Sequence, residues 1–134
     1  MKRIDYYIFC TFEPRSGLQH RALYSVPGIV VQKDQPDGKN IFWMNGLCVR
    51  PEEYGRTRDE LAAHLAEKGI ETRLFFNGMH RQPALRQFGC DCSVSYPVSD
   101  FLADNGLYLR SGSGLRDEDI ARVCGVIRTF GGLV

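Results

Sequence analysis

Hydrophobic residues recur with a helical period between residues 57 and 68. Leu61 and Leu65 lie four positions apart, so both side chains fall on one helix face. Thr57 and Glu60 form a capping-box pattern, in which each side chain satisfies a free backbone N–H group of the other residue. The pattern predicts a helix over residues 57–68.

Two later segments show the same period. Residues 117–128 carry apolar side chains at positions i, i+3, i+4 and i+7, which are Ile120, Val123, Cys124 and Ile127. A shorter helix is predicted over residues 97–105, because proline is favourable at a helix start. Its apolar face would consist of Val98, Phe101 and Leu102.

Strands are predicted where apolar and β-branched runs lack helical spacing. These runs are residues 4–12, 28–32, 41–49, 70–76 and 107–109. Residues 51–56 and 77–96 are predicted to be irregular. From residue 41 onward strands alternate with helices, which predicts an α/β fold: a two-layer sandwich of a small mixed or antiparallel sheet and about three helices.

Composition limits the classes of partner. The chain has 134 residues, of which 43% are hydrophobic and 25% charged, and its net charge is +1. That balance gives no electrostatic case for binding nucleic acid or an anionic membrane surface. No apolar run approaches the roughly 18 residues of a membrane span. The first residues lack the pattern of a signal peptide, so we expect a cytoplasmic protein.

The five cysteines do not indicate a disulfide framework, because their number is odd. Cys48 and Cys124 have apolar neighbours and are predicted to be buried. Cys90 and Cys92, with His80 nearby, could ligate a metal. Paired zinc ligands are usually separated by two or more residues, however. We therefore interpret this pair as free thiols in a loop and predict no metal site.

Known catalytic motifs give no support for an enzyme. The SGSG sequence at residues 111–114 is not followed by the lysine of a phosphate-binding loop, and it is interpreted as a turn. A serine nucleophile would need a G-x-S-x-G pattern, which the chain lacks. No catalytic residue is predicted.

Polar and aromatic residues gather between residues 73 and 83. A guanidinium group can donate two hydrogen bonds to a phosphate or carboxylate. Aromatic rings can line a pocket, and amide and imidazole groups can form hydrogen bonds with a polar ligand. The candidate substrate-binding residues are Arg73, Phe75, Phe76, Asn77, His80 and Gln82. In the alternative interpretation one Phe is core, Arg73 pairs with a surface acid, and His80 is solvated.

Three segments together resemble a known family. They are FWMNGLCV (42–49), RDELAAHLAEKGIETRLFFNGMHRQP (58–83) and PVSDFLADNGLYLRSGSGLRDEDIARVCGVIR (97–128). They are similar to the C-terminal part of the DegT/DnrJ/EryC1/StrS sugar aminotransferases, which depend on pyridoxal phosphate, and in particular to the perosamine synthases among them. The resemblance implies that residues 21–134 form the small domain of a fold type I enzyme, preceded by a divergent strand or extension at 1–20.

The resemblance also implies a place for the loop at 73–83, near the active site and the nucleotide-sugar pocket. The family's large domain, which holds the cofactor and its lysine, is not found in this sequence. The lysines present are Lys2, Lys33, Lys39 and Lys68, and none has the expected context. A pyridoxal-phosphate enzyme needs a lysine amine, so we expect this chain alone to bind no cofactor and to transfer no amino group.

Three interpretations follow from the resemblance. The chain is a fragment of an aminotransferase, a small domain that joins a large-domain chain in trans, or a binding module that self-associates and has lost the chemistry. The first two predict an exposed apolar face where the large domain would dock. The third predicts that this face is polar or is covered by dimerisation.

Overall fold

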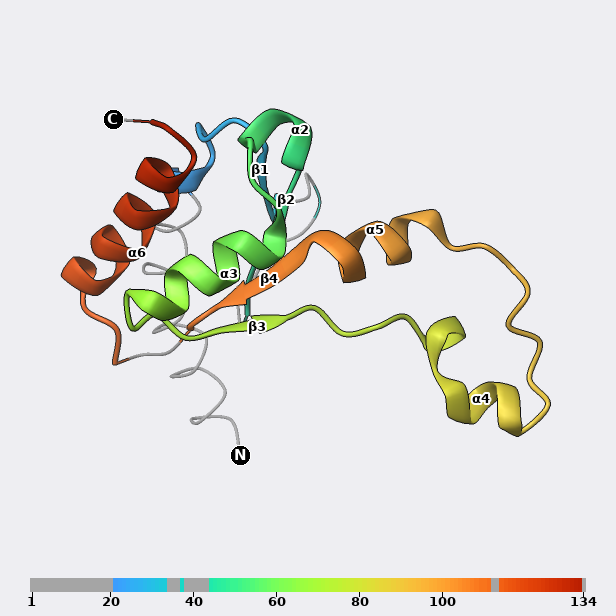
Figure 1. Cartoon of the computed structure of the whole chain (residues 1–134). Helices are drawn as coiled ribbons and strands as arrows, with labels where there is room; N and C mark the ends of the chain where they lie inside the picture. Colours follow the sequence, from blue (N-terminus) through green and yellow to red (C-terminus); the bar gives the residue numbers. More distant parts are fainter. Residues whose placement is uncertain (1–20, 34–36, 38–43, 112–113, 134) are drawn as a thin grey trace.

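The computed structural model describes residues 21–33, 37, 44–111 and 114–133. Four strands form one antiparallel sheet in the order β1-β2-β4-β3 (Figure 1). They are β1 (Ile29–Val31), β2 (Asn45–Val49), β3 (Thr72–Leu74) and β4 (Gly106–Leu109). Four of the predicted strands are thereby confirmed. Three have shorter bounds than predicted, whereas β4 begins one residue earlier. The run at 4–12 lies outside the described residues.

The helices are α2 (Pro51–Tyr54), α3 (Arg58–Glu67), α4 (Pro83–Gln87), α5 (Pro97–Asn105) and α6 (Asp117–Phe130), with a 3-10 turn, η1 (Met79–Arg81). The three predicted helices correspond to α3, α5 and α6. At the start of α3, the Thr57 N–H donates to the Glu60 carboxylate at 2.7 Å, and the Glu60 N–H donates to the Thr57 hydroxyl at 3.2 Å. The predicted capping box is confirmed.

The prediction that residues 51–56 and 77–96 are irregular was wrong at two places. Pro51 begins α2 and Pro83 begins α4, because the fixed φ of proline suits the first helical position. Gly55 and Gly89 follow these helices with φ of 77° and 78°, a left-handed conformation that ends helices. A proline followed by a glycine four or six residues later was the available sequence signal for both short helices.

The hydrophobic core lies between one face of the sheet and helices α3 and α6 (Figure 1). Its fully buried side chains include Leu47, Val49, Leu61, Leu65, Leu107 and Ile127. Tyr54 ties α2 to α6, because its hydroxyl donates a hydrogen bond to the carbonyl oxygen of Ile127. Burial raises the pKa of Tyr54 to about 12, which keeps this donor protonated at neutral pH.

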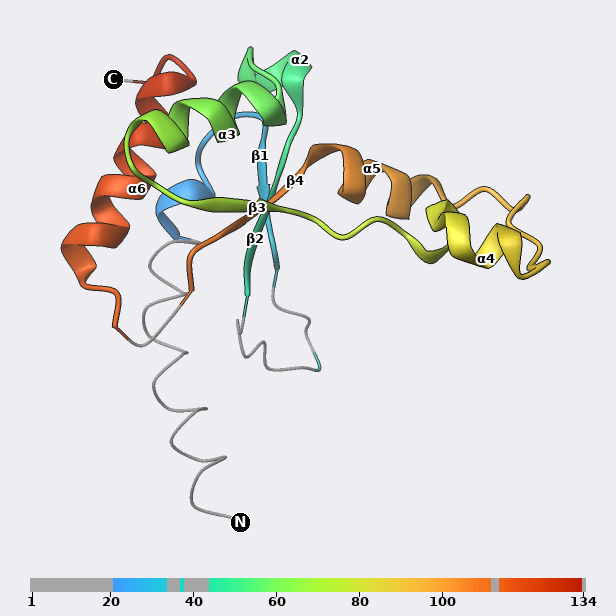
Figure 2. The same cartoon turned by 60° about the horizontal axis from the view of Figure 1, so that its bottom comes forward.

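Residues 76–105, which we call the arm, project away from the sheet and its helices (Figure 2). The arm contains η1, α4 and α5, and α5 leads back into β4. Ala103 is the one buried residue within it. The apolar face predicted for residues 97–105 is exposed instead: Val98 is 71% exposed, and Phe101 and Leu102 are each 37% exposed.

Candidate functional site

An aromatic pair lies on the sheet face opposite α3 and α6, because side chains alternate between the two faces of a strand. The rings of Phe75 and Tyr108 stack with centroids 4.1 Å apart. Glycines make room for the Phe75 ring: a Cβ at Gly106 would lie 2.1 Å from Phe75 Cδ2, and a Cβ at Gly46 would lie 2.8 Å from Phe75 Cζ. Glycines of two neighbouring strands therefore leave the space in which the Phe75 ring packs against the sheet.

Two hollows of about 350 Å³ each adjoin Tyr108. The first is mainly apolar and is lined by residues that include Val30, Met44, Cys48, Phe75 and Leu102. The second is polar and is lined by residues that include Glu71, Arg73, Arg110 and Ser111. Together they offer an aromatic surface beside two guanidinium groups and one carboxylate. Such a surface can bind a ligand that joins an anionic group to an apolar part.

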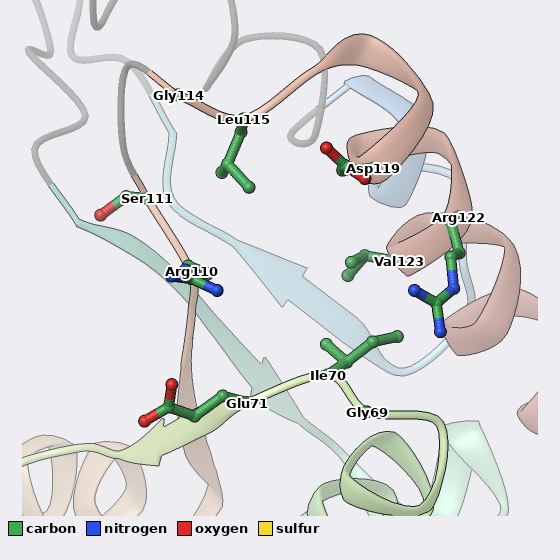
Figure 3. A pocket seen from close by; sticks show the side chains of 10 residues that line it. All are labelled: Gly69, Ile70, Glu71, Arg110, Ser111, Gly114, Leu115, Asp119, Arg122 and Val123. Carbon is green, nitrogen blue, oxygen red and sulfur yellow. The ribbon is translucent and has the colours of Figure 1, made fainter.

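A third hollow, of about 490 Å³, lies between the start of β3 and α6 (Figure 3). Arg122, which lines it, donates a hydrogen bond to the carbonyl oxygen of Lys68. Asp119 lines it too and accepts from the guanidinium of Arg116 at 3.1 Å, a contact that lowers the pKa of Asp119. None of the candidate substrate-binding residues lines this hollow.

Charged side chains join η1 to α5 within the arm. His80 Nε2 lies 2.8 Å from Asp100 Oδ1, and Arg81 forms ion pairs with both Asp100 and Asp104. The hydrogen bond from His80, followed by the charge of Arg81, lowers the pKa of Asp100. The hydrogen bond from Arg81 likewise lowers the pKa of Asp104. Both carboxylates are therefore ionised at neutral pH and hold the turn to the helix.

The structure divides the candidate substrate-binding residues into two groups. Arg73 and Phe75 lie at the hollows beside Tyr108. The other four lie on the arm and line none of the three hollows: Phe76, Asn77, His80 and Gln82. The structure does not bring the two groups together in one cavity.

The alternative interpretation of these residues fits only in part. Phe75 is half-buried and Phe76 is 78% exposed. The side chain of His80 is 14% exposed, so it is not a solvated loop residue. The sequence patterns did not identify three residues that contribute to these contacts: Tyr108, Arg81 and Asp100. Tyr108 was included in a predicted strand, and Asp100 lies 20 residues from His80, so no local pattern marked either one.

The arm exposes a large apolar surface. Its exposed side chains include Phe76 at 78%, Met79 at 68%, Phe88 at 85%, Val94 at 54% and Tyr96 at 49%. Exposed apolar side chains that form a contiguous patch are typical of interaction sites on soluble proteins. The two interpretations that involve a large domain predict such exposure, and in a single chain a face that a second copy covers is exposed as well.

The described lysines do not fit a pyridoxal-phosphate site. The ammonium group of Lys33 lies 5.7 Å from the ring centroid of Tyr24, and Lys68 is exposed at the end of α3. Neither residue lines any of the three hollows. The cofactor needs a lysine amine directed into a pocket, which the described residues do not supply.

Cysteine burial agrees with the sequence prediction. Cys48 and Cys124 are buried, whereas Cys90 is exposed and Cys92 half-buried. Burial raises the pKa of Cys48 and raises that of Cys124 to about 11, so both thiols stay protonated at neutral pH.

Within the described ranges, no three His, Cys, Asp or Glu residues are grouped to hold a metal ion. No helix in that part of the chain has the length and apolar character to cross a membrane.

Several solved protein structures share this fold. DesV from S. venezuelae superposes with a TM-score of 0.80 and 23% identity, over 98% of this chain and 35% of that one. An aminotransferase from Brucella abortus superposes with a TM-score of 0.76 and 22% identity, over 92% of this chain and 31% of that one. The fold is therefore that of one part of these larger chains.

Sequence comparison agrees with the fold. GDP-perosamine synthase from Escherichia coli O157:H7 is 30% identical over 102 residues, which are 76% of this chain and 26% of that enzyme. The enzyme from Caulobacter vibrioides is 31% identical over 86 residues, 64% of this chain and 22% of that enzyme. This chain thus spans about a quarter of the length of its curated relatives. The profile of one family matches residues 15–128, and the chain belongs to that family, the DegT/DnrJ/EryC1/StrS aminotransferases.

Proposed function

We propose that residues 21–134 are the small, substrate-side domain of a cytoplasmic, pyridoxal-phosphate-dependent aminotransferase that acts on a nucleotide-linked sugar. The domain is not catalytic without a cofactor-bearing domain, because the described lysines do not fit the cofactor. The proposal rests on the exposed apolar arm. That surface would dock on the cofactor-bearing domain and would bring the polar residues of the arm to its substrate pocket.

Substrate contacts are proposed for the two groups of residues described above. Arg73, beside Arg110 and Tyr108, would contact an anionic part of the nucleotide sugar. Phe75 would contribute an aromatic wall. On the arm, Phe76, Asn77, His80 and Gln82 would complete the pocket once the cofactor-bearing domain covers the apolar surface.

Reconstitution from two chains tests the proposal. The partner chain is the E. coli O157:H7 GDP-perosamine synthase from which the stretch similar to this chain has been deleted. Mixed with this protein and pyridoxal phosphate, it should co-elute in gel filtration. When a GDP-linked 4-keto sugar and an amino donor are added, the mixture should form GDP-perosamine, whereas each chain alone should be inactive. Absence of both the complex and the product would contradict the proposal.

A matched pair of variants locates the docking surface. Phe76→Ala removes an exposed ring from the arm, and Tyr24→Ala removes one that is 63% exposed outside the arm. A central aromatic contact often contributes more than 1 kcal/mol to binding. We therefore expect Phe76→Ala to weaken the complex about tenfold or more, and Tyr24→Ala to leave its affinity unchanged.

A self-associating binding module remains the competing function. In that case the arm would be covered by a second copy of the chain. Sedimentation at micromolar concentration distinguishes the two, because a stable dimer that does not bind the partner chain would support the module. A monomer that forms a complex with the partner chain would support the enzyme domain.

A further inference from the structure

We propose that Asp100 is a positioning residue, which fixes η1 against α5 and thereby sets the shape of the substrate-side segment 76–82. The link to substrate rests on the proposed function. The contacts that hold η1 against α5, which we call the brace, lie within the arm itself. Asp100 accepts from two consecutive residues of η1: His80 at 2.8 Å, and Arg81 through an ion pair.

The arm has no apolar core that could hold η1 in place. Neither η1 nor α4 contains a buried residue, and α5 buries only Ala103. Backbone hydrogen bonds within the segment are local, since the Arg81 N–H donates to the Gly78 carbonyl at 2.9 Å and the Gln82 N–H donates to the Met79 carbonyl at 3.0 Å. The contacts between η1 and α5 are therefore mainly those of the charged side chains.

Close packing at Gly78 shows that the contact between turn and helix is tight. A Cβ at this position would lie 2.5 Å from Ser99 Oγ and 2.6 Å from His80 Cε1. The His80 ring also lies with its centroid 5.0 Å from that of Tyr96, just before α5. Its side chain is 14% exposed, although it stands on an otherwise exposed arm.

Asp100 is the junction of this network. Arg81 also binds Asp104, one helical turn further along α5, with one of the two bonds at 2.9 Å. Asp104 therefore holds Arg81 alone, whereas Asp100 holds both His80 and Arg81. Loss of Asp100 would free the imidazole and leave Arg81 with one carboxylate. The polar residues at 76–82 would then lose their fixed orientation.

Hydrogen exchange tests the brace in the protein alone. Asp100→Ala should speed amide exchange at Arg81 and Gln82 about tenfold, because their hydrogen bonds open with the local structure. Exchange in α3 should not change, which controls for global unfolding. Asp117→Ala, at the start of α6, removes another acidic residue and should change neither region. Unchanged exchange at Arg81 and Gln82 in Asp100→Ala would overturn the brace.

Kinetics in the reconstituted two-chain enzyme test the link to substrate. Asp100→Ala should raise KM for the nucleotide sugar more than it lowers kcat, because the residue positions binding groups and does not touch the reacting atoms. Asp100→Glu keeps the charge and should restore part of the loss. Faster exchange with an unchanged KM would overturn the positioning role. Inactivity of the wild-type mixture would count against the proposed function and would leave the exchange result to decide the brace.

Discussion

Replacing Leu107 by alanine is expected to lower the free energy of unfolding by about 2–5 kcal/mol. Leu107 lies on β4, between β2 and β3, and its side chain is 0% exposed. Truncation removes apolar contacts and leaves a cavity that close-packed neighbours fill only in part. Because small domains are stable by only about 5–15 kcal/mol, this variant should approach the limit of folding. Urea denaturation followed by circular dichroism measures the change.

Leu74 provides a matched control for this prediction. It lies directly opposite Leu107 in the strand register, so both substitutions alter one row of the sheet. Leu74 is 53% exposed, and Leu74→Ala should therefore cost less than about 1 kcal/mol. Equal losses at the two positions would contradict the burial of Leu107 on the central strand β4 and the exposure of Leu74 on the edge strand β3.

The second large effect is expected at Gly106, where alanine should destabilise the fold by about 1–3 kcal/mol or more. A Cβ there would lie 2.1 Å from Phe75 Cδ2 and 2.4 Å from the backbone oxygen of Leu102. The Phe75 ring would have to leave its place on Tyr108, and the backbone at the end of α5 would have to shift. Near-ultraviolet circular dichroism should report loss of the aromatic stack together with the lower stability.

Gly125 shows whether this effect is specific to the crowded site. It lies in α6, and a Cβ there would meet no atom within 4 Å. Alanine has a higher helix propensity than glycine and restricts the unfolded chain more. Gly125→Ala should thus stabilise the protein by about 0.4–1 kcal/mol. Similar losses from both substitutions would contradict the seating of Phe75 on Gly106.

Local signals explain why much of the fold was predictable. The helix over 57–68 combined a capping pair with buried residues four apart, and the last helix combined acidic residues at its start with a regular apolar stripe. For these elements local propensity and tertiary packing agree. The short helices α2 and α4 carry no such stripe, so only a proline and a glycine marked them.

The candidate site was less predictable, because its geometry depends on contacts between distant segments. The pattern at 73–83 gathered suitable residue types, but it could not show that Phe75 points onto the sheet while His80 pairs with Asp100. The apolar residues of 97–105 suggested a packed helix. They are exposed because no described element covers the arm. An apolar pattern indicates a buried face without saying what buries it.

A chimeric enzyme tests most directly whether this chain is the substrate-side domain of a sugar aminotransferase. Residues 15–128 match the family and would replace the corresponding stretch of the E. coli O157:H7 GDP-perosamine synthase in one polypeptide. The measurement is the formation of GDP-perosamine, with the enzyme lacking that stretch as the control. We predict product from the chimera and none from the control. A chimera that folds and retains pyridoxal phosphate but forms no product would contradict the proposed function.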